Sequence, residues 1–122
     1  MRDLLAVTKA LADENRLRIV AALDGRELCL CQIVELLGLA TSTVSRHTSI
    51  LQQARLVRSR KAGRWTYFRL DDDAPSPAEE ATALVGRALE ADPRIREDAR
   101  RLGQILKLDP EELCRKQSEV KC

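Results

Sequence analysis

Apolar residues recur at helical spacing along most of the chain. The first two stripes consist of Leu4, Val7, Thr8 and Leu11, and of Leu17, Val20 and Leu23. Asp13 precedes the second stripe and is suited to cap the start of its helix. A third helix is expected from near Cys29 to Gly38, because glycine readily takes the left-handed conformation that follows a helix end.

A fourth helix is predicted from a Thr41 cap to about Ala54. Only the short link Leu39-Ala40 separates it from the third helix. The fourth helix is rich in small polar residues and carries Arg46. Two short helices joined by a tight turn, the second with such a surface, indicate a helix-turn-helix.

The pattern then changes to the alternation of strands. Residues 57–61 and 65–70 predict a β-hairpin with Ala62-Gly63 as its turn and a cationic tip. A hairpin placed directly after a helix-turn-helix is a wing, which can touch phosphates or the minor groove. The expected fold is therefore mainly α with a small β-hairpin wing, a winged helix-turn-helix.

Further helix starts are indicated by Pro75 and Pro77, by Asp92-Pro93 and by Asp109-Pro110. The 122 residues are 44% apolar, enough for the core of one folded unit. We find neither a secretory leader pattern nor an apolar run of about 20 residues, so we expect a cytoplasmic protein without a membrane partner. In that compartment, cysteines are metal ligands or reactive thiols more often than structural disulfides.

Positive charge is concentrated in one block. Residues 36–70 contain seven Lys or Arg and no Asp or Glu, whereas the rest of the chain is net acidic. Such a block indicates a polyanionic partner; a solubilising surface is the alternative. The residues expected to reach base edges or phosphates are Ser42, Thr43, Ser45, Arg46 and His47, and those expected to contact phosphates alone are Arg60, Lys61 and Arg64. His47 has a second interpretation as a packed neutral histidine.

Two thiols, Cys29 and Cys31, lie one residue apart where the third helix begins. Thiolates select soft ions, which favours arsenic(III) or antimony(III) before zinc. Residues i and i+2 of a regular helix point about 200° apart, so the first turn has to be distorted for both to hold one ion. The alternative is a pair of small buried cysteines in the core.

Several motifs follow one another in a characteristic order: Leu11-Ala12-Asp13, Arg16-Leu17-Arg18-Ile19, Glu27-Leu28-Cys29-Leu30-Cys31, Thr43-Val44-Ser45-Arg46-His47, and Gly63-Arg64-Trp65 followed by Phe68-Arg69-Leu70. Their order and spacing resemble the ArsR/SmtB family of winged-helix metalloregulatory repressors. The resemblance covers about residues 4–90 and implies a homodimer, held by the first helix and the helix after the wing, that leaves double-stranded operator DNA when a metal ion binds. It also implies that the Glu-Leu-Cys-x-Cys motif senses arsenite or antimonite. We therefore expect a DNA-binding and dimerisation domain in residues 1–90 and a helical extension with a cysteine-containing tail in residues 91–122.

Three positions depart from the family pattern. Thr48 stands where leucine is usual, Arg55 where glycine is usual, and Val34 where arsenic sensors of this type have a third cysteine. Because trivalent arsenic prefers three thiolates, we expect the tail to fold over the start of the third helix, in its own or the partner subunit. Cys114 is then the third ligand, with Cys122 as second choice; an added thiol such as glutathione is the alternative.

Other functions remain open at this point. Zinc or cadmium can be held by four cysteines. A redox- or reactive-sulfur-sensing repressor would join Cys29 to another cysteine. An enzyme is not expected, because no cysteine has a matched base and orienting group in the sequence.

Overall fold

The computed structural model describes the backbone of residues 1–121 and the side chains of residues 1–117, so Cys122 lies outside the described residues. Within that range no helix is long and apolar enough to cross a membrane. The elements follow in the order α1 (Arg2–Leu11), α2 (Glu14–Ala22), β1 (Leu28–Cys29), α3 (Leu30–Leu37), α4 (Thr41–Gln53), β2 (Val57–Ala62), β3 (Trp65–Leu70), α5 (Ser76–Ala88), α6 (Pro93–Ile105) and α7 (Pro110–Lys121).

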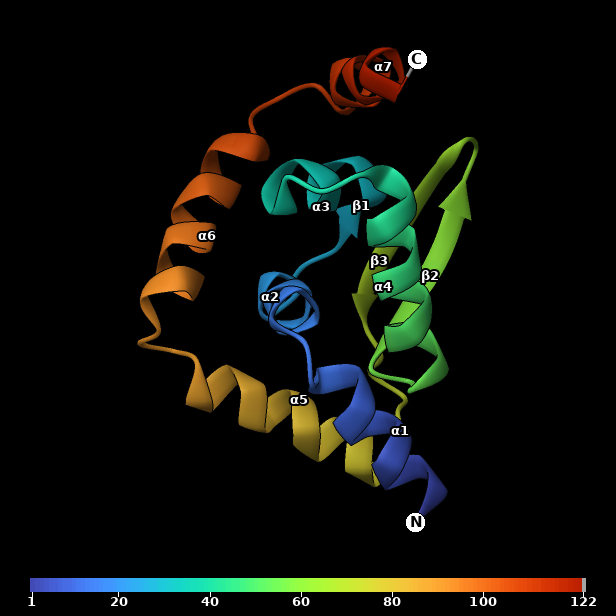
Figure 1. Ribbon diagram of the computed structural model, residues 1–122, viewed down its shortest axis with the longest axis vertical. Coiled ribbons are helices and arrows are strands. Elements are labelled where there is room, and N and C mark those ends of the chain that lie inside the picture. Colours follow the sequence, from blue (N-terminus) through green and yellow to red (C-terminus); the bar gives the residue numbers. More distant parts are fainter. Residues whose placement is uncertain (122) are drawn as a thin grey trace.

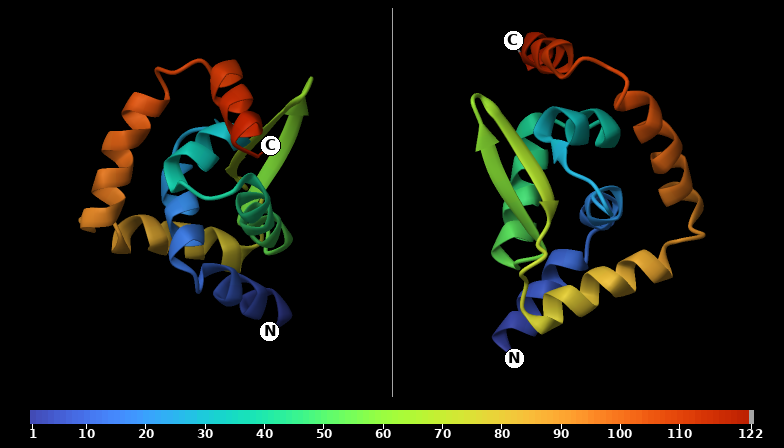
Figure 2. Two further views of the ribbon diagram at one scale, coloured as in Figure 1. Left: turned by 45° about the horizontal axis from the view of Figure 1, so that its top comes forward. Right: turned by 180° about the vertical axis from the view of Figure 1, so that it is seen from behind.

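Helix α2 lies in the middle of the molecule, and the other helices surround it (Figure 1). Helices α1 and α5 pack together at one end, α6 runs along one side, and α4 and the hairpin lie on the other. Helix α3 lies above α2 in this view and contacts both α4 and α6. Two further views show that α7 returns to lie over α3, near the tip of the hairpin (Figure 2). The core is aliphatic, with Ile19, Leu23, Leu36, Leu51 and Leu56 almost fully buried.

Most of the predicted helix signals are confirmed. Asp13 Oδ1 accepts hydrogen bonds from the backbone N–H groups of Asn15 (2.8 Å) and Arg16 (3.1 Å). Partial burial raises the pKa of Asp13, but these hydrogen bonds and the Arg16 charge outweigh it, so its pKa is lowered. Gly38 is left-handed, with φ 69°. The Thr41 cap was wrong: Ala40 already has the extended backbone that precedes a helix, so Thr41 is the first residue of α4.

The sheet is larger than predicted. Strand β1 pairs with β3 through Leu28↔Phe68 and Cys29↔Tyr67, which gives the antiparallel order β1-β3-β2. A strand of two residues is too short to show alternation in the sequence. The hairpin turn is also shifted by one residue, because Ala62 still pairs with Trp65 and the turn is Gly63-Arg64.

A buried ion pair joins α2 to α6. Arg18 donates to both carboxylate oxygens of Asp98, at 2.7 and 3.0 Å, and only 4% and 6% of the two side chains are exposed. Arg18 and Arg101 also donate to the backbone carbonyl of Leu36, at 3.4 and 2.8 Å. Helix α6 thus satisfies a carbonyl at the end of α3, where no intrahelical donor is left.

The backbone at Arg55 explains why glycine is usual at this position of the family pattern, because the φ angle of Arg55 is 61°. This left-handed conformation strains any residue with a Cβ, and glycine avoids the strain. We expect Arg55→Gly to raise the free energy of unfolding by about 1 kcal/mol in urea titrations. Arg58→Gly, an exposed position in a strand, is the matched control and should lower it. Equal or lower stability of Arg55→Gly would contradict this account of the position.

Candidate nucleic-acid interface and thiol site

One stripe of α4 faces outward. It consists of the exposed residues Ser42, Arg46, Ser49 and Gln53. Val44, Thr48 and Leu51 form the buried face. Among the predicted contacts, Ser42 and Arg46 lie on the outer stripe, whereas Thr43 and Ser45 are half-buried. Ser49 and Gln53 were missed, although their spacing of seven and eleven residues from Ser42 placed them on the same helical face.

His47 does not lie on this outer stripe. Its side chain is half-buried, and its Nδ1 atom is 3.2 Å from Nη1 of Arg16 at the start of α2. Arg16 in turn donates from Nε to the carbonyl of Ala10 at 2.6 Å. The histidine therefore packs where α1, α2 and α4 meet, and its predicted DNA contact stays a prediction.

Two of the three predicted phosphate contacts in the wing, residues 57–70, form ion pairs within the chain. Arg60 donates two hydrogen bonds to the carboxylate of Glu27, at 2.9 and 2.6 Å. Its Cζ atom lies 4.6 Å from the centre of the Tyr67 ring. Hydrogen bonding to Arg60 lowers the pKa of Glu27. Arg64 donates to Glu111 of α7 at 2.8 Å.

Most arginines of the basic block, residues 36–70, form ion pairs within the chain. The pairs are Arg55–Asp71, Arg58–Asp72, Arg60–Glu27, Arg64–Glu111 and Arg69–Asp72, and every acidic partner lies outside the block. Within the described residues, Arg46 and Lys61 form no ion pair. A polyanion that binds the basic block therefore meets five cations that carboxylates already hold, and two that have no ion pair in the part of the chain that the structure describes.

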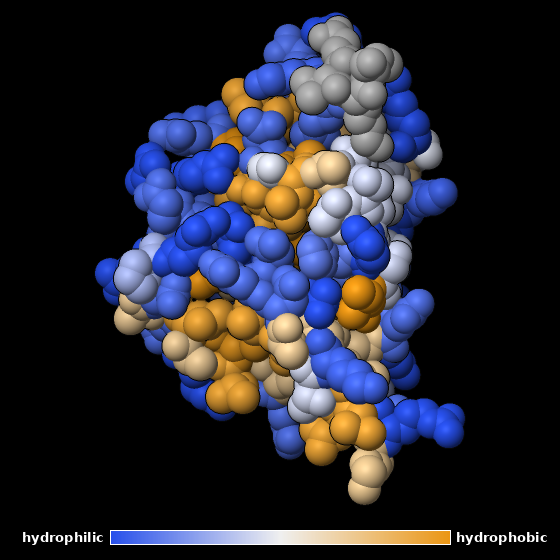
Figure 3. Space-filling model, in the orientation of Figure 1, coloured by the Kyte–Doolittle hydropathy of each residue, from blue (hydrophilic) through white to orange (hydrophobic). Residues whose placement is uncertain are grey.

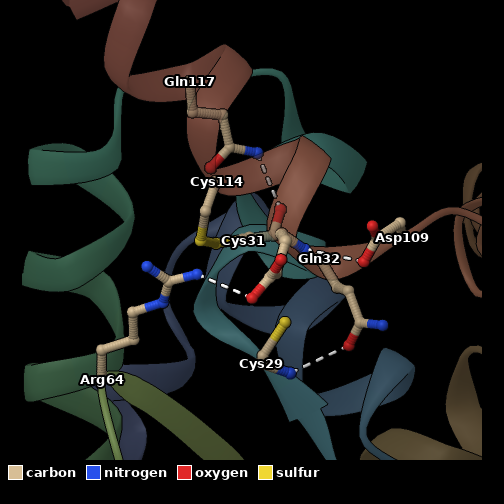
Figure 4. The surroundings of a disulfide bond; sticks show 8 residues. Cys29, Cys31, Gln32, Arg64, Asp109, Cys114 and Gln117 are labelled. Atoms are coloured by element: carbon tan, nitrogen blue, oxygen red, sulfur yellow. Dashed lines mark hydrogen bonds and ion pairs between the residues drawn. A yellow bond between two sulfur atoms is a disulfide. The ribbon is translucent and has the colours of Figure 1, made fainter.

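Two cysteines, Cys31 and Cys114, meet at the start of α3 (Figure 4). Cys31, in the first turn of α3, and Cys114, on α7, are joined by a disulfide with a Cα–Cα distance of 5.6 Å. Gln117 of α7 donates to the backbone carbonyl of Cys31 at 2.9 Å, and Leu113 is buried against the core. The tail thus lies over α3 of its own chain. A hollow of about 530 Å³ between wing and α7 is lined by Arg64, Trp65, Glu111, Cys114 and Arg115.

Cys29 lies apart from this pair. It is buried at the end of β1 and keeps its thiol, while its backbone N–H donates to Oε1 of Gln32 at 2.9 Å. Consequently, no group of three or more His, Cys, Asp or Glu side chains in the described part of the chain is gathered to hold a metal ion. The donor type still suits a soft ligand. Gathering three thiolates requires reduction of the Cys31–Cys114 disulfide.

A separate apolar surface covers α1 and α5. Leu4 and Leu5 of α1 are 54% and 48% exposed, and Leu84 of α5 is 57% exposed. Figure 3 shows apolar side chains at the end of the molecule where these two helices lie. Large exposed leucines on adjoining helices are unusual for a surface that faces only water.

The helix-turn-helix of α3 and α4 is followed by the β-hairpin wing of β2 and β3. This arrangement is the winged helix-turn-helix fold. Residues 13–59 match the family described as "Bacterial regulatory protein, arsR family". The chain belongs to this arsR family.

Three curated relatives are regulators. An arsenic resistance transcriptional regulator of Pseudomonas putida is 38% identical over 80 residues, which cover 62% of this chain and 62% of the relative. A cadmium resistance transcriptional regulatory protein homolog of Staphylococcus aureus is 37% identical over 73 residues, 58% of this chain and 60% of the relative. An HTH-type transcriptional regulator of Methanocaldococcus jannaschii is 35% identical over 68 residues, 55% of this chain and 76% of the relative. The chain thus spans less than two thirds of the first two relatives.

Solved structures agree on the fold. HlyU from Vibrio cholerae has a TM-score of 0.64 and 25% identity, covering 75% of this chain and 92% of that one. A homodimeric winged helix-turn-helix DNA-binding domain from Mycobacterium bovis has a TM-score of 0.62 and 26% identity, covering 73% and 77%. The predicted fold class is confirmed. The curated relatives described above are named as regulators.

Proposed function

We propose that this protein is a homodimeric repressor that binds operator DNA and is released when its cysteine thiolates bind arsenite or antimonite. The observation that carries the proposal is the position of the thiols. Cys29 and Cys31 lie at the start of α3, Cys114 is seated on that start, and α3 packs directly against α4 of the helix-turn-helix. A ligand at this point therefore acts on the element that meets DNA.

The outer stripe of α4 is the surface proposed for the major groove. Arg46 is the cation of this stripe, and arginine reads guanine through two hydrogen bonds. Lys61, exposed in the wing and without an ion pair among the described residues, is proposed to hold a phosphate. Together these groups place base contacts on the helix and positioning contacts on the hairpin.

The exposed leucines of α1 and α5 support a homodimer. A second copy placed against Leu4, Leu5 and Leu84 would remove this apolar surface from water. The Mycobacterium bovis domain in the fold comparison is described as homodimeric. Two symmetric copies imply a palindromic operator.

Thiol chemistry supports the choice of inducer. One of the relatives is named for arsenic resistance and another for cadmium resistance, so family membership leaves the ion open. Cys31 and Cys114 already lie within bonding distance, and Cys29 is two residues from Cys31. A trigonal set of three thiolates suits arsenic(III) or antimony(III), whereas zinc favours four ligands.

Ligand binding would reach α4 through the first turn of α3. Cys29 is held in β1 by pairing with Tyr67, and its N–H is held by Gln32. Drawing the Cys29 sulfur toward Cys31 breaks this arrangement at the base of the wing and shifts α3 against α4. Packed elements with two discrete arrangements are how such local changes are transmitted.

Operator binding is the experiment that tests the proposal, by fluorescence anisotropy with a palindromic duplex. We expect Lys61→Ala to weaken specific and nonspecific duplexes alike and to reduce the slope of log K against log salt by about 0.9 for each phosphate that is no longer neutralised. Arg46→Ala should lose about 1–3 kcal/mol of discrimination between matched and mismatched operators. Binding that shows neither salt dependence nor sequence preference would contradict the proposal.

A thiol redox sensor is the second candidate, and the Cys31–Cys114 disulfide favours it. Two thiols would give up two electrons and two protons to hydrogen peroxide, which is reduced to two waters as the S–S bond forms. This pairing differs from the predicted one, which used Cys29. Release of operator by peroxide but not by arsenite would support this candidate over the first.

A further inference from the structure

We infer that Glu111 on α7 acts as a phosphate mimic. When the thiols hold α7 on α3, which we call closure, Glu111 forms an ion pair with Arg64 at the wing tip. Closure and operator DNA therefore compete for the guanidinium of Arg64. This inference rests on the proposed function, because it needs an operator. Closure of α7 on α3, whether by an ion or by a disulfide, would weaken DNA binding in this way.

The ion pair lies between two exposed side chains. Arg64 Nη2 is 2.8 Å from Glu111 Oε1, and the side chains are 71% and 65% exposed. Solvent competes freely for such a pair, so its geometry depends on where the two backbones are held. The Arg64 backbone is fixed by the hairpin turn, which leaves the placement of α7 as the variable.

Among the described residues, three interactions besides the Arg64 pair hold α7 in place. The Cys31–Cys114 bond ties it to α3, Gln117 donates to the Cys31 carbonyl, and Leu113 is buried. Glu111 precedes Cys114 by three residues, so both side chains lie on the same side of the helix. A bond at Cys114 therefore holds the Glu111 carboxylate toward the wing, and Figure 4 shows Arg64 directed at α7 beside the disulfide.

Arg60, the second wing arginine, is also paired with a carboxylate close to a cysteine. Arg60 is held by Glu27, which lies two residues before Cys29. Both acidic partners of these two arginines thus belong to the segments that carry the thiols. Carboxylate and phosphate offer arginine the same kind of oxygen pair, so each carboxylate occupies a guanidinium that DNA would otherwise engage.

The expected effect of this competition on operator affinity can be stated. Operator affinity of the reduced, open protein should fall about two- to fivefold on closure through the Arg64–Glu111 pair alone, the range for one exposed ion pair. If Arg64 of each subunit releases one phosphate, the salt slope should also fall by about 0.9 per subunit. Any larger effect of closure belongs to the shift of α3.

The test compares reduced and disulfide-closed full-length protein on the same duplex across a salt series. In the wild type, closure should lower the salt slope as stated. In Glu111→Gln, closure should leave the slope unchanged, and free-thiol counts should show that the disulfide still forms. Glu112→Gln is the matched control: it removes the same charge one residue away, Glu112 has no ion pair among the described residues, and the wild-type response should persist.

Arg64→Gln completes the cycle, because Glu111→Gln should have no added effect in that background. An unchanged wild-type salt slope on closure, or equal effects of the two glutamine variants, would overturn the inference. Failure of arsenite to release operator contradicts the proposed inducer and leaves this test standing, since the disulfide closes α7 without arsenite. Absence of operator binding by reduced wild-type protein would overturn both.

Discussion

Asp98→Ala is expected to lower the free energy of unfolding by about 3–5 kcal/mol, because it leaves the Arg18 guanidinium buried without its counter-charge. Both side chains are almost fully buried, and Asp98 accepts two of the arginine's hydrogen bonds. For a domain of this size, such a loss is a large part of the total stability. Urea denaturation followed by circular dichroism measures it.

The matched control is Glu97→Gln on the same helix. Glu97 pairs with Arg100 on the surface, where both side chains are about half exposed, so its loss should cost no more than about 0.5 kcal/mol. Replacing the buried pair together, as Arg18→Met with Asp98→Leu, should recover most of the stability lost in Asp98→Ala. A loss from Glu97→Gln as great as that from Asp98→Ala would show that burial of the pair has no special effect.

The largest functional effect is expected at Cys29 and Cys31. Cys29→Ser and Cys31→Ser should each bind operator like the wild type and should no longer be released by arsenite. Ligand residues contribute to the ion-bound state alone, so their removal erases a coupling of typically about 1–3 kcal/mol, or 5- to 150-fold in operator affinity. Anisotropy titrations with arsenite, antimonite, cadmium and zinc measure this for each variant.

Leu113→Ala is a useful comparison for the thiol variants, since it removes a buried side chain of α7 without removing a sulfur. It should weaken closure and retain some release. Loss of operator binding in Cys29→Ser itself would mean instead that the buried thiol supports the β1 pairing and the fold. Release by cadmium and not by arsenite would show that cadmium, not arsenite, is the inducer.

Elements with strong local signals could be predicted from the sequence. Asp13 and Asp92 cap helix starts because their carboxylates accept hydrogen bonds from backbone N–H groups, and Gly38 ends α3 in the left-handed conformation. All three lie at the predicted places. Strand β1 could not be predicted, because its two residues become a strand through pairing with β3, far along the chain. The Thr41 cap failed for a local reason: the link residue Ala40 already provides the extended turn.

The charge of the interface was the least predictable feature. The basic block is obvious in the sequence, yet the partners Glu27 and Glu111 lie 33 and 47 residues from their arginines and are brought there by β1 and α7. Arg18 was visible only as part of a motif, and nothing local marked Asp98 as its partner 80 residues away. Such pairs depend on tertiary packing, which periodicity and capping signals do not report.

Arsenic X-ray absorption, paired with operator release, tests whether Cys114 supplies the third sulfur ligand and whether this ligand is needed for release. It is measured on reduced wild-type protein and on Cys114→Ser, with Cys122→Ser as the control for the other tail thiol. We predict three sulfur neighbours and full release in the wild type and in Cys122→Ser, and two sulfur neighbours with release lost in Cys114→Ser. Three sulfur neighbours and normal release in Cys114→Ser would contradict this prediction.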